Sequence, residues 1–73
     1  MKRELAEQIV ASVRSHKGPL ITIEEAKAMT KINSDGNEIY AINLGKFTFL
    51  AWVQNETCYG TAFYRWFGQW FGQ

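Results

Sequence analysis

The fold class of this chain is set by one run of residues, Phe47-Thr48-Phe49-Leu50-Ala51-Trp52-Val53. Aromatic and β-branched side chains favour an extended backbone, so this run is predicted to be a strand. Successive side chains of a strand point to opposite faces. Both faces are apolar here, because one carries Phe49 and Val53 while the other carries Leu50 and Trp52. One face is expected to pack on helices, and the other needs a separate cover.

A second strand is predicted immediately before this run. Tyr40, Ile42 and Leu44 recur at the period of two that is typical of a strand. Gly45 then begins a two-residue turn of type II′, which requires glycine in its first position. A short third strand is expected over residues 57 to about 60. The sequence therefore predicts an antiparallel β-hairpin or a three-stranded meander.

The first half of the chain is predicted to form two helices, and the first of them lies at the N-terminus. Leu5, Ile9 and Val13 are four residues apart, a spacing that places them on one helix face. Gly18 followed by Pro19 is a strong stop signal, because glycine adopts the left-handed position after a helix and proline cannot continue the ladder.

The second predicted helix begins at Thr22. Thr22 and Glu25 have the spacing of a capping box, in which each side chain bonds the other's backbone N–H. Met29 and Ile32 are expected on its buried face. The polar turn residues 33–37 would end the helix.

The composition indicates one small α+β domain over residues 1–73. Hydrophobic residues make up 47% of the chain and charged residues 21%, a balance that argues against disorder. The formal net charge of +1 gives neither the basic excess of a nucleic-acid binder nor a strong acidic character. A chain of this length buries only about 60% of its unfolded surface, so large side chains are valuable to its core.

The C-terminal segment is rich in aromatic residues. All eleven aromatic residues of the chain lie from Tyr40 onward. From Phe63 to Phe71 they recur at a helical spacing, which predicts a C-terminal helix capped by Thr61. A four-residue repeat also produces such spacing by itself, so a third strand that continues through Tyr64 remains an alternative.

This aromatic segment is the candidate functional surface. A contiguous apolar patch left exposed on a small protein marks an interaction site, and Trp, Tyr and Arg are enriched in interface hot spots. The alternative is that the rings simply complete the core. The predicted partner-binding residues are Tyr64, Arg65, Trp66, Phe67, Trp70 and Phe71.

The function predicted from this surface is protein binding without catalysis. A small inhibitor or adaptor would dock the aromatic surface in a partner's groove, and phages and other mobile elements encode proteins of that kind. A homo-oligomeric structural protein, such as a homodimer, is an alternative, because a second copy could cover the same surface. Nucleic-acid binding by strand and tail aromatics is a weaker alternative, since only Lys46 and Arg65 are basic in this half. Membrane binding is disfavoured for the same shortage of cations.

No catalytic, metal-binding or cofactor-binding residues are predicted. His16 is the only histidine and Cys58 the only cysteine, which leaves no ligand set for zinc and only a chance Cys–His pair. Gly-rich phosphate motifs are absent from the sequence. A single cysteine also excludes an internal disulfide, and this favours a cytoplasmic location.

Overall fold

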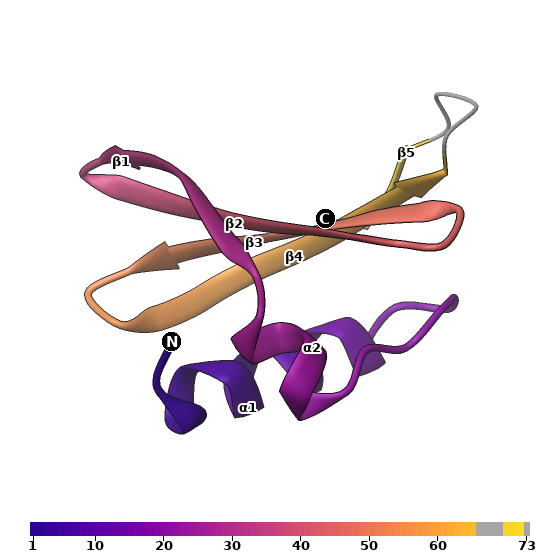
Figure 1. Cartoon of the computed structure of the whole chain (residues 1–73), viewed down its shortest axis with the longest axis horizontal. Helices are drawn as coiled ribbons and strands as arrows, with labels where there is room; N and C mark the ends of the chain where they lie inside the picture. The colour runs from indigo at the N-terminus through magenta and orange to yellow at the C-terminus, as the bar shows by residue number, and fades with distance from the viewer. Residues whose placement is uncertain (66–69, 73) are drawn as a thin grey trace.

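The computed structural model of the chain describes residues 1–65 and 70–72. In these residues it forms two helices, α1 (Arg3–Arg14) and α2 (Ile23–Lys27), and a five-stranded sheet. Its strands are β1 (Thr30–Asp35), β2 (Asn37–Leu44), β3 (Phe47–Gln54), β4 (Thr57–Arg65) and β5 (Trp70–Gly72). All neighbouring strands are antiparallel and follow chain order, β1-β2-β3-β4-β5. Both helices lie on the same side of this sheet (Figure 1).

The predicted α+β class and the central hairpin are confirmed. β2 pairs with β3 around Gly45, whose φ of 61° matches the first position of a type II′ turn. The predicted number of strands was wrong, because β1 and β5 extend the sheet on both sides of the expected three-stranded meander.

The second helix begins as predicted but ends earlier. The Thr22 hydroxyl accepts the Glu25 backbone N–H at 3.1 Å, and the Glu25 carboxylate accepts the Thr22 backbone N–H at 2.8 Å. The helix ends at Lys27, so the prediction that it continues to Ile32 was wrong. Ile32 lies in β1 and is 61% exposed. Residues 30–35 gain ladder hydrogen bonds with the edge of β2, and this outweighs their weak helix propensity.

The predicted C-terminal helix was wrong for the described residues. β4 continues through Thr61 to Arg65, and Trp70–Gly72 forms β5. Phe63 pairs with Phe49 across the β3–β4 ladder and is only 4% exposed. The burial of its ring between sheet and helix requires the strand conformation. The predicted helix also included residues 66–69 and 73, which lie outside the described residues.

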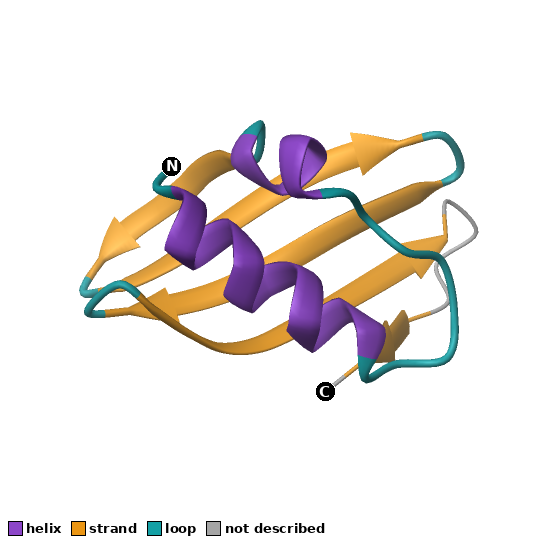
Figure 2. Ribbon diagram, turned by 90° about the horizontal axis from the view of Figure 1, so that it is seen from below, coloured by secondary structure: helices purple, strands orange, loops and turns teal. Residues whose placement is uncertain are grey.

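The core lies between the two helices and one face of the sheet, with α1 crossing the strands diagonally (Figure 2). Three phenylalanine rings pack against one another on that face. Their centroids are 5.8 Å apart between Phe47 and Phe63, and 6.2 Å apart between Phe49 and Phe63. The apolar residues buried in this cluster are Leu5, Ala6, Ile9, Val10, Val13, Ile21, Ala26, Met29, Phe49, Ala51, Val53 and Phe63.

Polar side chains of α1 and of the segment that follows it bind the outer side of β4. The Gln8 side-chain oxygen accepts the backbone N–H of Cys58 at 2.9 Å. The hydroxyls of Ser12 and Thr61 share a hydrogen bond of 2.7 Å, and the ring Nε2 of His16 donates to the Thr61 carbonyl at 3.0 Å. β5 pairs with β4 only over residues 62–64, so these contacts satisfy part of the strand edge that β5 does not reach.

Replacing Thr61 by valine is expected to lower the free energy of unfolding by about 1–2 kcal/mol. Thr61 is fully buried, and its hydroxyl lies within hydrogen-bonding distance of both Ser12 and His16. The isosteric valine preserves the packing but leaves both partners with a missing contact. Urea denaturation followed by far-ultraviolet circular dichroism measures the change. The exposed Thr57 of the same strand is the matched control, and equal losses for the two Thr→Val variants would contradict the prediction.

Candidate functional site

The candidate site is the sheet face that neither helix covers, which we call the open face. Directly paired residues of an antiparallel ladder point to the same face, so the strand register defines its members. Leu50 pairs with Ala41 on one side and with Ala62 on the other. β1 extends the face beside β2, where Thr30 pairs with Ala41, Asn33 with Ile39 and Asp35 with Asn37. The central part of the open face comprises nine residues: Ile39, Ala41 and Asn43 of β2, Thr48, Leu50 and Trp52 of β3, and Gly60, Ala62 and Tyr64 of β4.

None of these nine residues carries a charge. An antiparallel sheet with one solvated face usually places polar side chains there. On the open face the large side chains are apolar or aromatic, and Ile39, Leu50, Trp52 and Tyr64 are each half-buried. Two of its polar side chains bond each other: the Thr48 hydroxyl donates to the side-chain oxygen of its ladder partner Asn43 at 2.6 Å. A contiguous apolar surface of this kind is typical of an interaction site.

The register separates the predicted partner-binding residues by face. Tyr64 pairs with Thr48 and belongs to the open face. Arg65 pairs with Phe47, and its guanidinium carbon lies 5.8 Å from the centre of that ring, within range of a cation–π interaction. Arg65 is therefore directed toward the helix side of the sheet and away from Tyr64.

Two further predicted residues lie in β5. The ladder places Trp70 opposite Tyr64 and Phe71 opposite Phe63. Their backbone therefore extends the sheet at its edge, next to both faces of β4. The last two predicted residues lie outside the described residues: Trp66 and Phe67.

Sequence reasoning did not include Ile39, Leu50 and Trp52 among the site residues. The sequence did contain a pattern that indicates Leu50 and Trp52: the run 47–53 has two apolar faces, and the helices can cover only one of them. In the alternative interpretation, in which the C-terminal rings complete the core, the C-terminal segment would supply the second cover. Its described part instead adds β5 beside β4 within the same sheet, so no described helix or strand lies across the open face.

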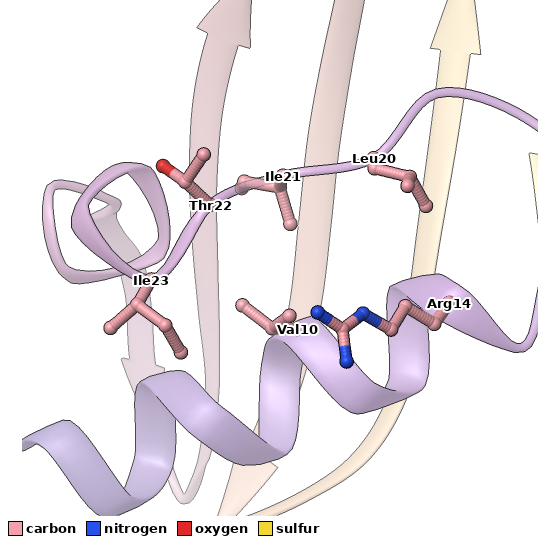
Figure 3. A pocket seen from close by; sticks show the side chains of 6 residues that line it. All are labelled: Val10, Arg14, Leu20, Ile21, Thr22 and Ile23. Atoms are coloured by element: carbon pink, nitrogen blue, oxygen red, sulfur yellow. The ribbon is translucent and has the colours of Figure 1, made fainter.

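A second apolar surface lies on the helix side, between α1 and residues 20–23 (Figure 3). It is a groove of about 390 Å³, and Leu20 at its rim is 64% exposed. The Arg14 side chain extends along the groove toward Val10 (Figure 3). The groove could accept one aliphatic side chain. It is lined by Val10, Arg14, Leu20, Ile21, Thr22 and Ile23.

The described residues offer little reactive chemistry. In residues 1–65 and 70–72, no three His, Cys, Asp or Glu side chains lie close enough to hold a metal ion. No helix in that part of the chain is long and apolar enough to cross a bilayer. Cys58 is half-buried beside α1, and its burial raises the pKa of the thiol. A thiol with a raised pKa is mostly protonated at neutral pH and is a weak nucleophile.

The alkylation of Cys58 is expected to reach half its maximal rate at a higher pH in the folded protein than in denaturant. Only the thiolate reacts, and folding favours the neutral thiol. By linkage, the free energy of unfolding should fall as pH rises past the ordinary thiol pKa, and it should stop falling above the raised pKa. Iodoacetamide rates between pH 7 and pH 11 measure the shift. The same midpoint in both states would contradict it.

Comparisons with known proteins add no family to this geometry. No family model matches the chain, and no match was found among curated proteins or solved structures. The open face is therefore the main basis for a functional proposal.

Proposed function

We propose that this protein is a non-enzymatic protein–protein interaction module whose docking surface is the open face. The proposal is supported chiefly by one observation: nine neighbouring residues on three strands, all but the buried Ala62 at least partly exposed, form an uncharged, largely apolar surface that neither helix covers. Water contact with such a surface is unfavourable, and a partner that removes it gains roughly 25 cal/mol for each Å² of apolar area.

The residues at the centre of the open face suit recognition of a protein. Trp52 and Tyr64 are of the types most enriched in interface hot spots. Leu50 lies between them on the central strand of the sheet. Strands held by ladders on both sides are already ordered, so docking loses little conformational entropy. The open face is thus a preorganised apolar platform.

Nucleic-acid binding receives less support from the same surface. Trp52 and Tyr64 could stack on bases, but a strand of nucleic acid also needs cations along its phosphates. The nine residues of the open face include none. Arg65 is directed to the helix side, and Lys46 lies in the turn after β2.

A capture experiment with matched variants tests the proposed function. Leu50→Asp places a carboxylate on the open face, and Leu20→Asp places the same group at an exposed position on the helix side. Each immobilised protein is incubated with a lysate of the source cells and, separately, with untagged wild-type protein. We expect binding to be lost with Leu50→Asp and retained with Leu20→Asp. Binding that is equal for all three baits, or absent for the wild type in both incubations, would rule out the open face as docking surface.

A further inference from the structure

We infer that the partner of the open face is a second copy of this chain, packed face to face as a two-fold dimer. The inference rests on the proposed function and specifies its partner. Two identical open faces would bury each other's side chains, as the two sheets of a β-sandwich do at a spacing of about 10 Å. The helices of both copies would then lie on the outside.

The charge distribution favours a second copy. In a two-fold interface every side chain near the axis lies close to the same side chain of the other copy, so any charge there meets its like. Interfaces between different proteins commonly use complementary charges to select and orient the partner. The nine central residues of the open face include no charged residue for that purpose, and Asp35 lies at the outer edge of the sheet, opposite Asn37. The net charge of +1 adds almost no repulsion between two copies.

The dimensions of the sheet set an upper limit on the area of such a dimer interface. The molecule extends 31 × 23 × 19 Å along its principal axes. The sheet is seen edge-on along the shortest axis in Figure 1 and face-on in Figure 2, so it lies in the plane of the 31 Å and 19 Å axes. These two extents multiply to about 590 Å² per copy, or about 1,200 Å² for the pair. That product is an upper limit for the contact area, and it lies at the lower bound for specific interfaces, so we expect a weak dimer whose population depends on protein concentration.

The position of Leu50 permits a direct test of two-fold packing. Leu50 lies near the middle of β3, and β3 is the central strand of the five. An axis through the centre of the face therefore brings the two Leu50 side chains close together. Leu50→Asp alone and Leu50→Lys alone would each place like charges at the axis. An equimolar mixture of the two variants would place opposite charges there.

Sedimentation equilibrium at protein concentrations from 1 to about 500 μM measures this association. We expect a monomer–dimer equilibrium for the wild type and for Leu20→Asp. For Leu50→Asp and for Leu50→Lys we expect dissociation constants at least tenfold higher, and the mixture should recover dimer. Circular dichroism confirms that each variant is folded.

Three results would overturn the second copy as partner: a wild type that is monomeric throughout, a dimer unaffected by both Leu50 variants, or a mixture that stays as monomeric as its components. The failure of the dimer can be distinguished from the failure of the proposed function. A monomeric wild type that captures a different protein in a Leu50-dependent manner would retain the open face as a docking surface. If that capture is also insensitive to Leu50→Asp, both proposals fail.

Discussion

Replacing Phe63 by alanine is expected to lower the free energy of unfolding by about 3–5 kcal/mol, a large part of the stability of a domain this small. The Phe63 side chain is 4% exposed and packs edge-on against Phe47, with the His16 ring 6.3 Å away. Truncation leaves a cavity at the junction of β3, β4 and the segment after α1. The rings around it are held by the sheet, so the cavity cannot collapse fully. Thermal and urea denaturation measure the loss.

Tyr59 of the same strand is the control for this prediction. Its side chain is 58% exposed, so Tyr59→Ala should change stability by no more than about 0.5–1 kcal/mol. The contrast also tests the strand conformation of β4, because the expected C-terminal helix gave Phe63 no place between the sheet and α1. A small loss for Phe63→Ala, similar to that for Tyr59→Ala, would contradict the packing described for this ring.

Gly18→Ala is expected to destabilise the protein by about 1–3 kcal/mol. A Cβ atom at Gly18 would overlap the Cζ of Phe63 and lie 3.0 and 3.1 Å from its two Cε atoms. The ring cannot retreat, because Phe47 and Phe49 pack against its other sides. Alanine also restricts the unfolded chain, which would stabilise the fold by about 0.4–1 kcal/mol. The steric overlap is the larger of the two effects.

A double-mutant cycle with Phe63→Leu separates these contributions. The smaller leucine side chain removes the atoms that meet the new methyl group. In this background Gly18→Ala should cost much less than in the wild type, with a coupling energy of about 1 kcal/mol or more. Additive effects of the two substitutions would show that the contact between Gly18 and Phe63 does not determine the cost.

The sequence predicted the elements whose signals are local. The alternation over residues 47–53, the glycine at position 45 and the capping box at Thr22 each depend on neighbours along the chain, and the structure confirms all three. The stop signal at Gly18 and Pro19 also lies shortly after the observed end of the first helix, at Arg14. The role of Gly18 was misread, however, because its φ of 159° is close to extended. The glycine is needed there to leave room for Phe63.

The incorrect predictions concern elements defined by partners distant in sequence. Residues 30–35 form a strand because β2 offers them a free edge, and the helix-like spacing beyond Thr61 did not reveal that Phe63 pairs with Phe49. The turn at Asn55 and Glu56, with φ of 51° and 57°, joins β3 to a longer β4 than expected. Pairing energy of this kind is not visible in the spacing of residues along one segment.

The candidate site was predicted only in part for the same reason. The second apolar face of β3 was evident from Leu50 and Trp52, but it was expected to have a cover of its own, and no described helix or strand lies across it. Its extension across the sheet to Ile39 and Tyr64 depends on the register of two ladders. The register also separates Tyr64 from Arg65, a division that consecutive positions in the sequence could not establish for a segment expected to be helical.

The hydrogen bonds from Gln8, Ser12 and His16 to the outer side of β4 have a consequence for self-assembly. Those of Gln8 and His16 occupy backbone groups of Cys58 and Thr61 that could otherwise pair with a strand of another molecule, and that of Ser12 holds the Thr61 side chain beside them. The N-terminal helix thus blocks the addition of strands from other molecules at this edge of the sheet. Local detachment of this helix would expose the unpaired edge of β4 while the rest of the sheet is still folded. We therefore expect fibre formation to begin from this locally unfolded state and not from the fully unfolded chain.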